Sequence, residues 1–390
     1  MKQITHYLLS RSLFLVILCA LISLTHAGEC RWTGDGSDNK ASNPDNWLDG
    51  QAPGTDDSVL LNGLYNKDMF WDLTTSVSSW TQDGYTGTVT IPTEFDPNGY
   101  SSLLITGDCF IDTGTWTHPG PQTSANNRLH VTVAGSMYIG ADAALNVLGK
   151  GFAVNYGPGA PASGTSGGGS YGGHGGETRL STCYGSITEP TELGSGGRGN
   201  TPHPGGGAVI LVVGGELTVD GSINADSINQ INRPGSGGSI FIITDSLTGN
   251  GSISVKGGNG HAGGGGGRIS IILTGDDSEI DDFNGTINAS GGQGAGFNGA
   301  AGTIYIETHQ DIADRGTLII DNNGLSTLYG YWTDLLANSP VTYEFSQIIL
   351  TNSGRLAINP DVTLDIQNTV IHGCGISDGE GLVLNSGVLL

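Results

Sequence analysis

The chain has 390 residues, of which 67 are glycine, and it carries 37 acidic residues against 14 lysines and arginines. This acidic excess repels phosphate backbones, so we exclude nucleic acid as a main partner. Apart from a short N-terminal run, no segment is long and apolar enough to cross a bilayer, and we expect no membrane span.

Residues 1–27 predict a secretory signal peptide. Lys2 and Arg11 supply positive charge, residues 13–22 form the apolar run, and cleavage is expected after Ala27. We therefore expect a secreted or cell-surface protein. The cysteines left after cleavage are too far apart to predict a zinc site, and an export compartment permits disulfides of several connectivities. They are Cys30, Cys109, Cys183 and Cys374.

Residues 28–100 are rich in Trp, Asp and Asn and contain no glycine tract. Their phrases are Arg31-Trp-Thr-Gly34, Asn43-Pro-Asp-Asn-Trp47 and Gly84-Tyr-Thr-Gly-Thr-Val-Thr-Ile91. These phrases resemble the N-terminal segment of large bacterial exported surface proteins of the autotransporter-like, β-helix class. The resemblance implies a secreted or surface β-helix and carries over no catalytic residue. We expect this segment to supply the first strands and a cap in which Trp32 and Trp47 cover the end of the coil. Exposed tryptophans stacking on sugar rings are the alternative.

Residues 101–344 repeat one phrase, in which a glycine tract runs directly into a short strand of alternating aliphatic residues. The strands begin near residues 208, 239, 268 and 303, a spacing typical of solenoid repeats. Two columns are aliphatic and should point inward, whereas the column between them varies and should point outward. The inward columns are Val209, Ile240, Ile269, Ile304 and Leu211, Ile242, Ile271, Ile306, and the outward column is Ile210, Phe241, Ser270, Tyr305.

This period-2 alternation and the β-branched composition predict an all-β protein, specifically a parallel β-helix solenoid. Residues 345–390 continue as further β-helix strands without long glycine tracts, and their apolar end suggests a truncated product or a covered terminus. The glycine tracts should leave the coil at one corner and stack as a wall. Arg268, which precedes one inward strand, is expected on the surface.

The longest tract, residues 149–207, is expected to be either an adaptable contact surface or a mobile or self-packed insertion, and its removal should leave the fold intact. It collects aromatic and basic residues that we predict to bind a partner, namely extracellular glycan, matrix or cell surface. These residues are Tyr171, His174, Arg179, Tyr184, Arg198 and His203.

The sequence assembles no recognisable catalytic set, cofactor motif or metal site. The calcium-binding β-roll is excluded because its aspartate positions hold Ala262 and Gly296. A polysaccharide-active lyase or hydrolase of the pectin-lyase-like class is the alternative function, with Asp276 and Asp277 as its candidate carboxylates. The preferred interpretation is a non-catalytic structural or adhesive surface protein.

Overall fold

A computed structural model describes residues 28–96, 99–100, 103–163, 166–177, 181–200, 202–328, 330–336, 342–373 and 380–390. The predicted signal peptide, Arg179 and Cys374 lie outside the described residues. The described part of the chain is all-β, and its helical residues form two single 3-10 turns, η1 (Pro44–Asn46) and η2 (Ile280–Asp282). Within the described ranges, no helix has the length and apolar character needed to cross a membrane.

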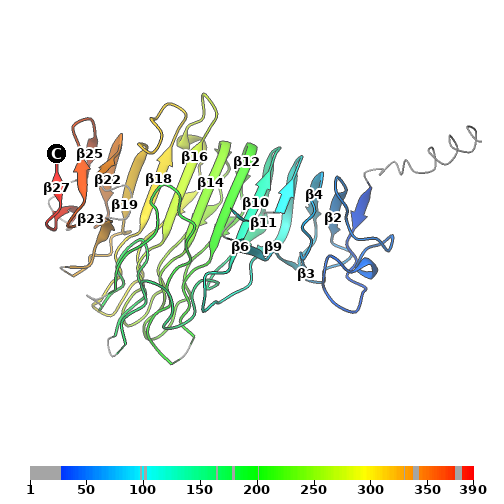
Figure 1. Ribbon diagram of the computed structural model, residues 1–390, viewed down its shortest axis with the longest axis horizontal. Helices are drawn as coiled ribbons and strands as arrows, with labels where there is room; N and C mark the ends of the chain where they lie inside the picture. Colours follow the sequence, from blue (N-terminus) through cyan, green and yellow to red (C-terminus); the bar gives the residue numbers. More distant parts are fainter. Residues whose placement is uncertain are drawn as a thin grey trace, which may run out of the picture.

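The strands follow one another along the long axis of the molecule from the N-terminus to the C-terminus (Figure 1). The N-terminal strands are β1 (Glu29–Arg31), β2 (Ser58–Asn62), β3 (Met69–Phe70), β4 (Ser79–Asp83), β5 (Thr88–Thr90), β6 (Thr93–Asp96), β7 (Gly99–Tyr100), β8 (Leu103–Ile105) and β9 (Cys109–Thr117). The middle strands are β10 (Asn127–Val133), β11 (Met137–Asn146), β12 (Ala208–Val219), β13 (Ser222–Asn224), β14 (Ser239–Thr248), β15 (Ser252–Ser254), β16 (Arg268–Leu273), β17 (Thr286–Asn288) and β18 (Thr303–Glu307). The C-terminal strands are β19 (Thr317–Asp321), β20 (Thr333–Leu335), β21 (Thr342–Glu344), β22 (Gln347–Thr351), β23 (Arg355–Ile358), β24 (Thr363–Asp365), β25 (Val370–His372), β26 (Gly381–Leu384) and β27 (Val388–Leu389).

Most strand pairs are parallel, as expected when each turn of the chain lies beside the previous turn. β8, β10, β12, β14, β16 and β18 form one continuous parallel track, and β11, β13, β15 and β17 form another. The exceptions are the antiparallel pairs β6–β7, β6–β10 and β18–β19. The fold is therefore compatible with a β-helix solenoid.

The two predicted inward columns are confirmed by register and burial. Parallel pairing places Val209, Ile240, Ile269 and Ile304 in one row and Leu211, Ile242, Ile271 and Ile306 in another. All eight are buried within one hydrophobic cluster. Burying each such side chain contributes about 1.5–3 kcal/mol, so the aliphatic alternation specifies the register of the sheet.

The hydrophobic core changes to the opposite face of the sheet at the antiparallel pair β18–β19. Ile304 and Ile306 belong to the first cluster, whereas Tyr305 between them belongs to a second one. Leu318 on β19 lies opposite Tyr305 and joins that second cluster, which continues through the strands up to β24. The C-terminal strands thus enclose their own core instead of extending the first one.

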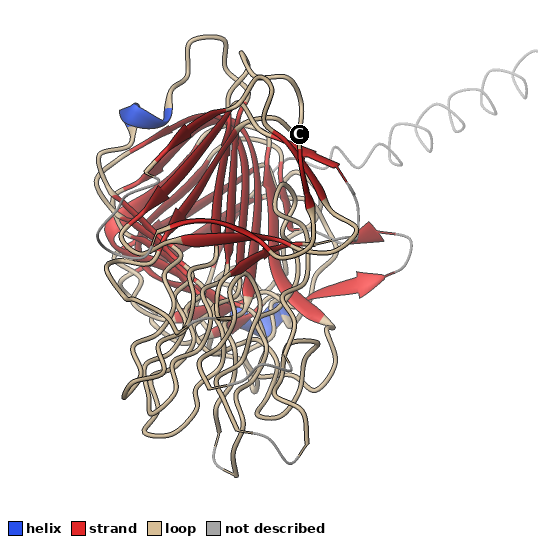
Figure 2. Cartoon of the chain, turned by 90° about the vertical axis from the view of Figure 1, so that its left-hand side faces the viewer, coloured by secondary structure: helices blue, strands red, loops and turns tan. Residues whose placement is uncertain are grey.

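The glycine tracts gather on one side of the strands, where their loops lie below the sheets in Figures 1 and 2. They pack backbone against backbone: the amide of Gly176 donates to Gly263 O at 2.8 Å, and that of Gly265 donates to Gly169 O at 2.9 Å. A Cβ atom added at Gly265 would lie 1.9 Å from Gly173 O, which no side chain tolerates. The tracts therefore form a dense glycine layer.

Candidate functional site: a buried cysteine, histidine and aspartate

The described parts of the long segment 149–207, called the covering segment below, lie over the outer face of the sheet formed by β12, β14, β16 and β18. Side chains of that face donate hydrogen bonds to backbone carbonyls of the segment, namely Ser239 to Glu192 O (2.6 Å), Arg268 to Tyr184 O (2.9 Å) and Ser270 to Thr188 O (2.6 Å). The middle column of these strands was predicted to face outward, and it is buried because this segment lies over it. The expectation of an adaptable, removable surface loop is therefore wrong.

Arg268 is buried by the covering segment. The prediction that it lies on the surface is wrong, because its side chain is fully buried. Its guanidinium lies 5.6 Å from the centre of the Tyr171 ring, and Nη1 donates to Thr303 Oγ1 at 3.2 Å. Nη2 is buried without a hydrogen-bond partner. The cation thus anchors the covering segment to the sheet.

Three reactive side chains meet under this cover. His174 and Cys183 come from the covering segment, and Asp334 comes from β20, which is far away in the sequence. A ligand atom of each lies within 4.8 Å of the other two, and none of the three residues is more than 9% exposed. His174 Nε2 and Asp334 Oδ2 are 2.7 Å apart.

Backbone contacts hold the histidine in place. The amide of His174 donates to Trp332 O at 3.1 Å, and the amide of Ala300 donates to His174 O at 2.8 Å. Gly173 forms an isolated antiparallel bridge with Thr333, whose hydroxyl donates to Ala301 O at 2.6 Å. The segment is therefore attached to both the glycine layer and the strand that carries Asp334.

The cluster favours a charged histidine beside a charged aspartate. Burial alone would lower the pKa of His174, but the neighbouring Cys183 sulfur and Asp334 carboxylate outweigh burial and raise that pKa well above its ordinary value. Burial acts to raise the pKa of Asp334, yet the hydrogen bond and charge of His174 hold it below its ordinary value. The histidine and aspartate therefore form an ion pair.

Not all polar atoms of the cluster are satisfied. His174 Nδ1 and Asp334 Oδ1 are buried and have no hydrogen-bond partner. Each such atom costs about 1–3 kcal/mol of folding free energy unless something pairs with it. A thiol, an imidazole and a carboxylate can serve chemically as a nucleophile with its base and orienting acid, or as ligands of a metal ion.

The predicted binding residues do not share one surface. The rings of Tyr171 and Tyr184 are 4.6 Å apart, and Tyr171 and His203 are buried, whereas Tyr184 and Arg198 are half-buried. Their role in binding stays a prediction. Sequence reasoning missed Cys183 and Asp334, because no local pattern indicates that these positions meet His174.

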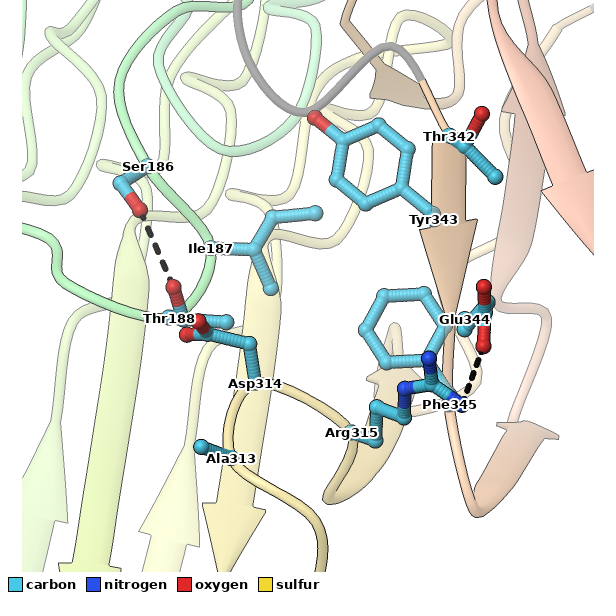
Figure 3. A pocket seen from close by; sticks show the side chains of 10 residues that line it. All are labelled: Ser186, Ile187, Thr188, Ala313, Asp314, Arg315, Thr342, Tyr343, Glu344 and Phe345. Carbon is cyan, nitrogen blue, oxygen red and sulfur yellow. Dashed lines mark hydrogen bonds and ion pairs between the residues drawn. The ribbon is translucent and has the colours of Figure 1, made fainter.

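An open groove lies beside this region, and Figure 3 shows its lining. It has a volume of about 370 Å³ and is lined by residues 186–188, 313–315 and 342–345. Arg315 and Glu344 form an ion pair there. Asp276 and Asp277, the candidate carboxylates of a glycan-cleaving enzyme, are exposed and do not line this groove.

Together, the fold and the site define an all-β protein of parallel strands whose outer sheet face is sealed by a glycine-rich segment. Comparison of the chain with protein-family models, with curated proteins and with solved structures gives no match.

Proposed function

We propose that this protein is an exported structural β-helix of the cell exterior, with a non-catalytic, adhesive role. The observation that carries the proposal is the continuous parallel register from β8 to β18, with its aliphatic columns buried inside. A solenoid of this kind buries its apolar surface between neighbouring turns and provides a long, stiff body.

Buried tryptophans near the N-terminus favour the proposal that this segment caps the solenoid. Trp32 and Trp47 are buried, and their rings pack edge to face with centroids 5.3 Å apart. Buried rings cannot stack on a sugar, so this pair favours the cap over the exposed glycan platform. Trp71, Trp80 and Trp116 extend the aromatic packing inward through two further edge-to-face contacts.

A stacked aromatic pair, in which Phe110 is exposed and Tyr138 is half-buried, supports an adhesive surface elsewhere. Phe110 on β9 is 40% exposed, and its ring stacks on that of Tyr138 on β11, with centroids 5.0 Å apart. The parallel register aligns these two residues with Thr81 on β4 and Thr218 on β12. Aromatic rings beside hydroxyl groups suit the alternating apolar and polar surfaces of an extracellular glycan.

The test combines export with binding. The tagged full-length chain is expected in the extracellular or surface fraction, and purified protein lacking residues 1–27 is expected to bind on a glycan array. Replacing both Phe110→Ser and Tyr138→Ser should weaken that binding at least tenfold. Tyr156→Ser, which removes another exposed aromatic ring, should leave binding unchanged.

Two results would contradict the proposal. One is retention of the full-length chain inside the cell. The other is release of new reducing or unsaturated ends from bound glycans by the purified protein, because that would make it an enzyme.

A further inference from the structure

We propose that His174, Cys183 and Asp334 form a zinc site that fastens the covering segment to β20. The donor set is one imidazole nitrogen, one thiolate sulfur and one carboxylate oxygen, which is a combination that zinc accepts. The inference is independent of the exported, adhesive role, because it depends only on these three side chains.

The distances suit a bound ion after small side-chain movements. The three ligand atoms lie within 4.8 Å of one another, whereas ligands around a tetrahedral zinc ion are roughly 3.3–3.8 Å apart. The separation of 2.7 Å between His174 Nε2 and Asp334 Oδ2 would lengthen slightly as both groups turned toward the metal. Binding would displace two protons to solvent, one from the Cys183 thiol and one from the His174 imidazolium, and a water molecule can complete the coordination.

A second observation points to a ligand at this place. His174 Nδ1 and Asp334 Oδ1 are buried and unpartnered, so the cluster has more polar atoms than its protein contacts satisfy. Buried polar groups in folded proteins nearly always have a partner, and a bound ion can supply one where the protein does not. A metal ion that takes Asp334 Oδ1 as a ligand would give this atom the partner that the protein does not supply.

Burial separates the metal site from the nucleophilic alternative. A catalytic cysteine must reach a substrate atom, yet Cys183 is 4% exposed and does not line the groove of Figure 3. A metal ion needs no groove for a substrate. It would bind two positions of the covering segment to Asp334 and so fix the segment over the sheet.

The experiment uses the chain without residues 1–27, stripped of metal with a chelator and titrated with cobalt(II) as a spectroscopic substitute for zinc. We expect one cobalt ion per chain, a thiolate-to-cobalt charge-transfer band and the intense visible bands of tetrahedral cobalt. Excess zinc should abolish these bands and raise the melting temperature by several degrees.

Variants assign the bands to residues. Cys183→Ser should abolish the charge-transfer band, and Asp334→Asn should weaken cobalt binding at least tenfold. Cys30→Ser is the matched control, since Cys30 is a free cysteine outside the cluster, and it should keep the spectrum.

The proposal is overturned if folded wild-type protein, verified by circular dichroism, shows no charge-transfer band at saturating cobalt. That measurement needs no variant and stands even if Cys183→Ser does not fold. Rapid alkylation of Cys183 in the native protein, unaffected by zinc, would also overturn it and would favour a reactive thiol. Neither outcome bears on export or glycan binding.

Discussion

At the scale of single residues, the polar side chains buried between the sheet and the covering segment determine how the two fit together. Arg268 is the largest of them, and its partners are a ring, a hydroxyl and a backbone carbonyl. Removing this buried guanidinium should reduce the stability of the protein, because its loss leaves a cavity and unpaired hydrogen-bond acceptors.

We therefore expect Arg268→Ala to lower the free energy of unfolding by about 3 kcal/mol. Urea denaturation followed by circular dichroism measures this change. Arg198→Ala is the control, because Arg198 is half-buried and should cost less than about 1 kcal/mol. Equal effects of the two substitutions would show that Arg268 does not anchor the segment.

His118 predicts a pH dependence of stability. Its Nδ1 donates to Pro119 O at 2.8 Å and its Nε2 accepts from the Ala208 amide at 3.2 Å, so the ring is neutral. Burial lowers the pKa of His118 to about 4, and the hydrogen bond to Pro119 opposes this shift only in part. The nearby cations Arg128 and Lys150 lower the pKa further.

Because the folded-state pKa of His118 lies below the ordinary value of about 6.5, the unfolded chain takes up a proton that the folded chain refuses. Stability should fall as the pH drops from about 6.5 to about 4 and then level off, with a total loss of about 3 kcal/mol from this residue. His118→Gln should flatten the profile in this window, whereas His309→Gln, at an exposed residue, should not. An unchanged slope in His118→Gln would contradict the prediction.

At the scale of elements, the glycine layer explains why the chain devotes long stretches to residues that offer no side-chain packing. Extended backbones approach more closely than any Cβ would allow, and they pair their amides with carbonyls of neighbouring tracts. The layer holds the covering segment, so removing residues 160–200 should now destabilise the protein instead of leaving it unchanged.

Gly265→Ala tests the layer with a single methyl group. The added Cβ would lie 1.9 Å from Gly173 O, and relieving that overlap should cost about 1–3 kcal/mol of stability. Gly54→Ala is the matched control, because the nearest atom to its added Cβ is a carboxylate oxygen at 3.5 Å. Thermal melting of the two variants measures the difference, and equal melting temperatures would argue against a tightly packed layer.

The sequence predicted the strands and their inward columns, because aliphatic alternation is a local signal that burial enforces. It did not predict that the covering segment lies over the outer face of these strands. The outward column contains three apolar residues, Ile210, Phe241 and Tyr305, beside Ser270. Their apolar character was the one local signal that this face is buried. His174 contacts Asp334 only because the covering segment folds back over strands that are distant in the sequence. Short-range sequence patterns do not predict such a long-range contact.

At the scale of the whole molecule, the two large hydrophobic cores of the described residues lie on opposite faces of the sheet and meet at β18–β19. The reversal arises from one antiparallel pair, in which Tyr305 and Leu318 face the second core. The two cores consist of separate sets of side chains. Each core should therefore contribute separately to the free energy of unfolding.

We expect the two cores to respond separately to truncation. Leu350→Ala in the second core should cost about 2–5 kcal/mol and speed amide hydrogen exchange in β19, β22 and β23 more than in β12 and β14. Leu211→Ala in the first core should give the reverse pattern. Uniform acceleration in both variants would indicate a single cooperative unit.

The glycine layer also affects how well the folded protein resists proteases. Proteases recognise an extended stretch of chain through its side chains and through free backbone hydrogen-bonding groups. The tracts present few side chains, and many of their amides and carbonyls are already engaged with neighbouring tracts. We therefore expect the packed parts of the tracts to resist digestion, although a glycine-rich sequence by itself predicts an easily cut chain.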